Sequence, residues 1–80
     1  MFSGEYLNGK AIGKGKEYNR YGKLIFEGEY LYGQRIKGKE FISERLEYEG
    51  EYLFNKKWNG KGYDENGNIA YEIINGKNKS

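Results

Sequence analysis

The 80-residue chain contains no cysteine, no histidine and no proline, and each absence excludes a chemistry or a structure. Without cysteine there is no disulfide framework, thiol nucleophile or thiolate metal site. Without histidine there is no imidazole base and no common zinc site. Without proline, every strand is free to pair along both of its edges. We therefore expect no metal site and no cofactor.

Long apolar runs and a dominant charge of one sign are missing as well. No segment approaches the ~20 apolar residues of a membrane-spanning helix, and the first five residues lack the basic and apolar regions of a signal peptide. Lys+Arg 14 against Asp+Glu 12 gives a net charge of +2, with the two signs interspersed. No broad basic face for nucleic acid is indicated. We expect a cytoplasmic protein, with a peripheral place at a membrane or at the cytoskeleton as the alternative.

What the chain does contain is glycine and aromatic residues: Gly 13, Tyr 9, Phe 4 and Trp 1. Because valine is absent and other aliphatic residues are few, the rings must supply the core. A chain of this length buries little surface by itself. We therefore expect marginal stability or further burial against a second copy, and so a homodimer.

Glycine and rings recur in one phrase. The phrase starts at Phe2, Phe26 and Tyr48 and reads FSGEYL, FEGEYL and YEGEYL, and a degenerate copy, YEIING, starts at Tyr71. The chain is thus a single array over residues 1–80. Its repeats run over approximately 2–25, 26–47 and 48–70, with a partial repeat over 71–77 that is typical of an array cap.

Within each phrase, rings and glycine alternate with glutamate, which is the period of two of a half-buried strand. Segments 7–12, 31–36 and 54–59 predict hairpin turns, with Asn8-Gly9 as the clearest signal. Turn residues at 21–23, 43–45 and 65–68 mark the opposite ends. Strands are expected near 2–7, 13–18, 24–31, 37–43, 46–53, 60–63 and 69–74. The predicted fold class is all-β, an elongated single-layer antiparallel meander of repeated β-hairpins with no long helix.

Glycine in the middle of a strand lowers stability, so the presence of Gly4, Gly28 and Gly50 calls for a structural explanation. We expect each to open a slot in which a ring from the adjoining strand lies flat. A ligand platform made by the ring face is the alternative to this self-packing. A second glycine- and lysine-rich string follows each phrase. Compared among the repeats, the spacing of this string differs by a deletion before Gly38 and an insertion around Trp58.

This unit of about 23 residues resembles the MORN repeat (membrane occupation and recognition nexus) from residue 2 to about residue 76. The chain departs from that pattern at Lys37, at Asn55 and throughout the fourth unit. The repeat-defining aromatic and glycine residues are Phe2, Gly4, Tyr6, Gly13, Gly15, Phe26, Gly28, Tyr30, Gly38, Tyr48, Gly50, Tyr52, Gly60 and Gly62. The resemblance implies the hairpin sheet and a non-enzymatic protein-interaction or assembly scaffold that self-associates.

The same resemblance implies two alternatives. One is a peripheral membrane module that binds acidic phospholipids, namely phosphoinositides or phosphatidylserine. The other is a repeat fragment of a larger protein, such as a chain related to phosphatidylinositol phosphate kinases. We expect a fragment of a longer array or a very short member of the family.

Two sets of charged residues are candidates for function. The glutamates could suggest acid–base chemistry; they are Glu5, Glu27, Glu29, Glu47, Glu49 and Glu51. Lysines of the following strands should lie opposite them, so cross-strand ion pairs are the better interpretation, and we expect no catalytic residue. The lipid-binding candidates are Lys56, Lys57 and Lys61 beside Trp58, because each lysine near an anionic leaflet contributes about 1 kcal/mol and tryptophan suits the headgroup level.

Overall fold

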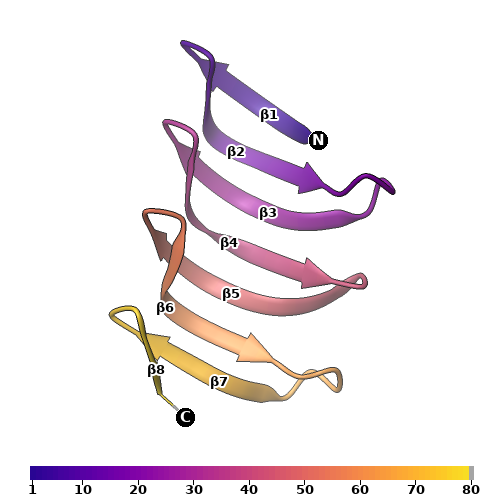
Figure 1. Cartoon of the computed structure of the whole chain (residues 1–80), viewed down its shortest axis with the longest axis vertical. Coiled ribbons are helices and arrows are strands. Elements are labelled where there is room, and N and C mark those ends of the chain that lie inside the picture. Colours follow the sequence, from indigo (N-terminus) through magenta and orange to yellow (C-terminus); the bar gives the residue numbers. More distant parts are fainter. Residues whose placement is uncertain (80) are drawn as a thin grey trace.

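The computed structural model describes residues 1–79, which form one antiparallel sheet and no helix (Figure 1). Its eight strands are β1 (Phe2–Leu7), β2 (Lys10–Tyr18), β3 (Leu24–Leu31), β4 (Gln34–Ile42), β5 (Arg45–Leu53), β6 (Lys56–Tyr63), β7 (Ile69–Ile74) and β8 (Lys77–Lys79). Each strand pairs with the next one along the chain. The sheet measures 39 × 29 × 15 Å, and its shortest dimension is that of a single layer. The predicted all-β meander is confirmed.

Two-residue turns close the hairpins along one edge of the sheet. The turns are 8–9, 32–33, 54–55 and 75–76, and both residues of each have positive φ. This geometry matches the right-handed twist of paired strands. The predicted turn segments 7–12, 31–36 and 54–59 are therefore wrong in length, because β2, β4 and β6 begin directly after these pairs. Strand β8 was not predicted, since its three polar residues carry no alternating pattern.

β2, β4 and β6 bend soon after they begin. Figure 1 shows that each of these strands leaves its turn in one direction and then changes direction. At each bend the pairing with the preceding strand skips residues, which are Gly13, Lys14, Ile36 and Trp58. Such bulges bend a strand and increase its twist. The bends let hairpins contact one another through their turns. The Gly33 N–H donates to the Ala11 carbonyl over 2.9 Å, and the Gly76 N–H donates to the Trp58 carbonyl over 2.8 Å.

A row of glycines crosses β1 to β6. Its members stand opposite one another and are Gly4, Gly15, Gly28, Gly38, Gly50 and Gly60. The Phe26 ring lies over the middle of the row, because a Cβ on Gly28 would come within 2.9 Å of it and one on Gly38 within 2.6 Å. The prediction that the slot at Gly28 is filled from the adjoining strand is wrong. Phe26 and Gly28 share a face two residues apart on β3, so the ring folds along its own strand and also covers the neighbouring strand's glycine.

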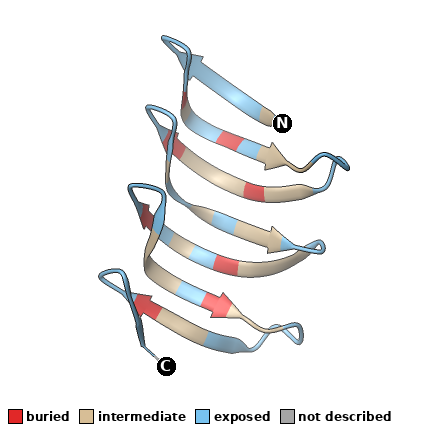
Figure 2. Cartoon of the chain, viewed as in Figure 1, coloured by how far each residue is buried: buried red, intermediate tan, exposed pale blue. Residues whose placement is uncertain are grey.

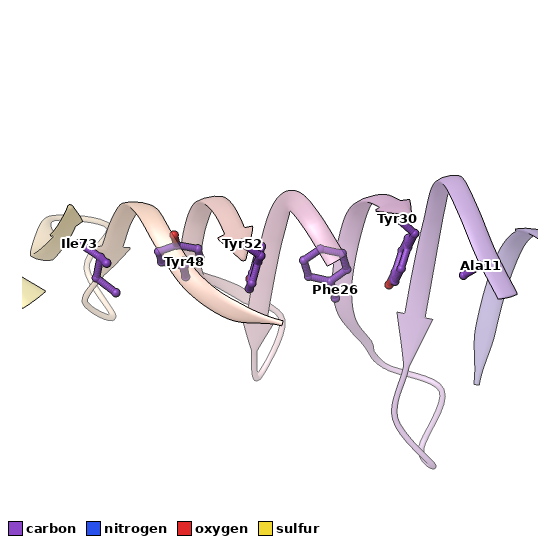
Figure 3. Packing of buried hydrophobic residues seen from close by; sticks show 6 residues of the cluster. All are labelled: Ala11, Phe26, Tyr30, Tyr48, Tyr52 and Ile73. Atoms are coloured by element: carbon purple, nitrogen blue, oxygen red, sulfur yellow. The ribbon is translucent and has the colours of Figure 1, made fainter. Parts of the chain in front are cut away.

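The rings form a continuous edge-to-face ladder on this face. Successive centroids lie 4.8–5.5 Å apart along Tyr6, Phe2, Tyr30, Phe26, Tyr52 and Tyr48. Such pairs contribute about 0.5–1.5 kcal/mol each beyond area burial. Phe26 and Tyr48 are fully buried, and Ala11 and Ile73 close the cluster at its two ends (Figure 3). Figure 2 shows the buried positions scattered through an otherwise exposed or half-exposed sheet, so the core consists of the buried rings of the ladder together with Ala11 and Ile73.

The third hairpin corrects the alignment of the repeats. Gly60 pairs with Gly50 in the glycine row, so it corresponds to Gly15 and Gly38. The predicted insertion around Trp58 is wrong, because β4 and β6 both skip one residue and β2 skips two. Gly62 therefore holds the place of Glu17 and Glu40. Beyond Gly60 the row ends, since Ile73 stands opposite it on β7.

Candidate functional site

The face opposite the rings carries two rows of alternating lysine and glutamate, one on each side of the glycine row. One row is Lys14, Glu29, Lys37 and Glu51, and the other is Lys16, Glu27, Lys39, Glu49 and Lys61. Lys37 Nζ lies 3.3 Å from Glu29 Oε2, and Lys16 Nζ lies 3.5 Å from Glu27 Oε2. The predicted cross-strand ion pairs are confirmed at these positions. Because the side chains are about half exposed, each pair contributes less than about 1 kcal/mol.

Two glutamates depart from the predicted pattern. Glu5 stands opposite Ile12 rather than a lysine, because the bulge in β2 moves Lys14 out of register. Glu47 pairs with Arg45 of its own strand, with 3.6 Å between Oε1 and Nη1. The alternating rows therefore begin only where β2 meets β3.

A groove of about 750 Å³ runs between the two charged rows, across β1 to β5. Glycine backbone forms its floor at Gly15, Gly28, Gly38 and Gly50, and lysine and glutamate side chains form its walls. Ser3 and Tyr18 line it at the β1–β2 end. The absence of side chains in the glycine row thus has an effect on both faces. On one face it leaves room for the aromatic rings, and on the other it leaves a low groove floor between the charged side chains.

The ring face carries a partly buried ionic cluster, here named the Arg35 joint, made of Arg35, Glu17, Glu40, Tyr30 and Tyr52. Arg35 donates to both carboxylate oxygens of Glu17, from Nε over 2.9 Å and from Nη2 over 3.0 Å. Its Nη1 lies 3.8 Å from Glu40 Oε2, and its guanidinium stacks 4.2 Å from the centroid of the Phe26 ring. Tyr30 donates to Glu17 and Tyr52 donates to Glu40. The joint ties the first three hairpins together.

The environment of the joint shifts its pKa values. Burial acts to raise the pKa of Glu17, but hydrogen bonds from Arg35 and Tyr30 outweigh it and leave that pKa lowered. Burial, followed by the hydrogen bond to a carboxylate, raises the pKa of Tyr30 and of Tyr52. These shifts favour one arrangement, in which the Glu17 carboxylate is charged and the phenols of Tyr30 and Tyr52 are neutral donors. The arrangement is suited to holding structure, since each of these three shifts moves a pKa away from neutral pH.

Lys57 holds the place of Arg35 in the next hairpin, since both stand opposite the second ring of their repeat. Lys57 Nζ donates to the Tyr71 hydroxyl over 2.8 Å and lies 4.9 Å from the centroid of the Tyr48 ring. These three residues are named the Lys57 joint. Within residues 1–79 it includes no carboxylate: Gly62 holds the place of Glu40 on the strand of Lys57, and Glu40 itself is engaged by Tyr52 and Arg35.

The four lipid-binding candidates do not come together on one surface. Lys56 is exposed beside the third turn, whereas Lys57 packs among rings. Trp58 is partly covered by the fourth turn, where a Cβ on Gly76 would come within 2.9 Å of its ring. Lys61 lies on the charged face between Glu49 and Glu72.

The hydrogen-bonded roles of Arg35, Glu17 and Glu40 were not predicted, because their partners lie up to 18 residues apart in the chain.

Within residues 1–79 no three acidic, histidine or cysteine side chains gather closely enough to hold a metal ion. The described part of the chain also contains no helix of the length and hydrophobicity needed to cross a membrane. A comparison with protein-family models finds no match, and a comparison with curated proteins finds none either. The resemblance to MORN repeats therefore rests on the sequence pattern alone.

Proposed function

We propose that the chain is a non-enzymatic protein-interaction scaffold and that the groove on its charged face receives an extended segment of a partner protein. The groove itself is the observation that carries this proposal. It crosses five strands, its floor is backbone, and six of the eight charged side chains in its walls are engaged in ion pairs. A surface that is open, regular and largely ion-paired is suited to recognition rather than to bond chemistry.

The charge of the groove narrows the class of partner. Four lysines and four glutamates line it, so their formal charges sum to zero. Such a surface exerts no net attraction on phosphate groups, which argues against nucleic acid or a phospholipid headgroup as the occupant. Lysine and glutamate stems and glycine Cα atoms provide apolar contact between the charged ends. The proposed occupant is therefore a segment of low net charge with small apolar side chains.

A selection experiment tests the groove. Random twelve-residue peptides displayed on phage are selected against the 80-residue protein, and enriched peptides are titrated into ¹⁵N-labelled protein. We expect the amides of Gly28, Gly38 and Gly50 to shift. Ser3→Trp, which plugs one end of the groove with a residue that strands tolerate well, should weaken binding at least about tenfold, whereas Ser3→Thr should not. Absence of enriched peptides, or shifts that avoid the groove floor, would contradict the proposal.

A second copy of the chain is the first partner to examine. Within residues 1–79, twelve large hydrophobic side chains are exposed in the isolated chain against five that are buried, which leaves apolar surface for association. Light scattering at micromolar concentration should give a mass of at least twice 9.4 kDa. A strict monomer would exclude self-association but would leave the groove open to other proteins.

A further inference from the structure

A line of exposed apolar residues follows the edge of the sheet where the two-residue turns lie (Figure 1). This line, named the tip ridge, consists of Leu7, Leu31, Tyr32, Leu53, Phe54 and Ile74. Leu7, Leu31, Leu53 and Ile74 each end the first strand of a hairpin, so the ridge repeats with the array. Phe54 is 74% exposed and Tyr32 is 60% exposed. The ridge is separate from the groove, and no core contact accounts for its rings.

The backbone at the two ring positions is unfavourable for the residues that occupy it. Tyr32 has φ 49° and Phe54 has φ 52°, in the left-handed region that bulky side chains rarely adopt. The equivalent positions in the outer hairpins are Asn8 and Asn75, both at φ 51°, and asparagine is favoured there. The two middle hairpins thus have a strained backbone at the positions where an aromatic ring is exposed. Strain that stabilises no part of the fold points to function.

The ridge is basic. Residues 7–10, 31–34, 53–56 and 74–77 contain Lys10, Lys56 and Lys77 and no aspartate or glutamate. Lys10, Lys56 and Lys77 are exposed directly after their turns. A partner for this edge must therefore offer apolar contacts flanked by negative charge.

The spacing of the ridge selects the form of the partner. Adjacent turns are two strands apart, or about 9.6 Å at the usual strand separation. Seven residues of an α-helix rise about 10.5 Å, whereas same-face residues of an extended strand repeat every ~6.8 Å. A polyproline segment repeats every ~9.3 Å, but such segments dock in aromatic-lined grooves, and within residues 1–79 neither Tyr32 nor Phe54 packs against another ring. A lipid bilayer can contact apolar side chains at any spacing, so the regular spacing of the ridge does not point to a bilayer.

We infer that the tip ridge binds an amphipathic α-helix of a partner protein, with apolar residues at heptad spacing and acidic residues beside them. The helix lies along the edge and across successive turns. Leucines of its apolar stripe contact Leu31, Tyr32 and Phe54, and its glutamates face Lys56 and Lys77. This surface is additional to the groove and does not depend on it.

The probe for this inference is a synthetic helix of four heptads with leucine at positions a and d and glutamate at e and g. Repulsion among its glutamates disfavours self-pairing. Titrated into ¹⁵N-labelled protein, it should shift the amides of residues 31–34 and 53–57 and leave the groove floor unchanged. A version with two central prolines, which cannot form the helix, should not bind.

The decisive variant is Tyr32→Asn/Phe54→Asn, which gives the middle turns the residue already present in the outer turns. Because asparagine suits this backbone, the melting temperature should stay the same or rise. Affinity for the probe helix should fall at least about tenfold. Tyr21→Asn, which removes another exposed ring away from the ridge, should leave binding unchanged. Lys56→Glu/Lys77→Glu should weaken binding in a salt-dependent manner.

Four outcomes would overturn the inference. These are no binding of the probe helix, shifts confined to the groove floor, undiminished binding by the asparagine variant, and equal loss with Tyr21→Asn. Vesicles of phosphatidylcholine and phosphatidylserine provide the competing occupant. The inference is wrong if these vesicles sediment the protein, if this sedimentation depends on Phe54, and if the probe helix does not bind. The ridge would then be an edge that contacts lipid.

Discussion

The Arg35 joint and the Lys57 joint occupy equivalent places in consecutive hairpins, yet they are built differently. Arg35 is held by two carboxylates and two ring faces, those of Phe26 and Tyr52. Lys57 has a phenol and two ring faces. On the strand of Lys57 itself, Gly62 holds the place that Glu40 holds on the strand of Arg35. The carboxylate that Arg35 has on its own strand therefore has no counterpart at the Lys57 joint.

The space left by Gly62 is filled in a different way. The Tyr71 ring packs directly against Gly62, so the fourth repeat contributes a ring where the first and second contribute a carboxylate. Tyr71 holds the place of Phe26 and Tyr48, but Ile73 interrupts the glycine row and leaves no slot over β7. The comparison indicates that the aromatic joint goes together with the point at which the glycine row stops.

The largest expected effect separates the two joints. Arg35→Met removes the only cation between two carboxylates that are about three-quarters buried and should lower the free energy of unfolding by about 2–4 kcal/mol. Lys57→Met keeps the packing of the stem, loses one hydrogen bond and two cation–π contacts, and should lower it by about 1 kcal/mol. Urea unfolding at pH 7 followed by circular dichroism measures both. Equal losses would show that the carboxylates do not distinguish the joints.

A smaller effect compares glycines at the two joints. A Cβ on Gly28 would meet the Lys37 carbonyl and the Gly38 backbone, which cannot move without separating strands. The three atoms nearest a Cβ on Gly62 all belong to the Tyr71 ring, which is a side chain and can shift more easily than backbone. We expect Gly28→Ala to cost about 2–3 kcal/mol and Gly62→Ala about 1 kcal/mol. Thermal melts of the two variants check the ranking, and equal losses would contradict it.

Residues with a local period were predictable from the sequence, and residues that meet only through the bends were not. The alternation around Gly28 predicted the strand, its buried face and the charged face opposite. Gly60 was misaligned because the number of bulge residues differs among β2, β4 and β6, and this number sets the register without a sequence signal. Arg35 reaches Glu17 across a bend, so neither residue alone indicated the ionic joint.

The smallest effect expected concerns alkaline pH and again compares the joints. Burial raises the pKa of Tyr48 to about 12 from its usual 10, and burial together with the carboxylate partners raises the pKa of Tyr30 and Tyr52 as well. Because the folded-state pKa exceeds the unfolded-state pKa, the unfolded chain loses these protons first. The stability that these phenols contribute is complete below pH 10 and is lost as pH rises through the folded-state values.

We therefore expect a melting temperature that does not change between pH 7 and 9 and then falls above pH 10. Tyr52→Phe, at the Arg35 joint, should flatten this decline more than Tyr48→Phe, because its phenol faces the charged Glu40 carboxylate whereas the Tyr48 hydroxyl donates to the Glu51 carbonyl over 3.0 Å. Absorbance at 295 nm should show the buried phenols ionising together with unfolding. Ionisation of all phenols near pH 10 in a chain that stays folded would show that the hydrogen bonds to Glu17 and Glu40 do not hold the protons in place.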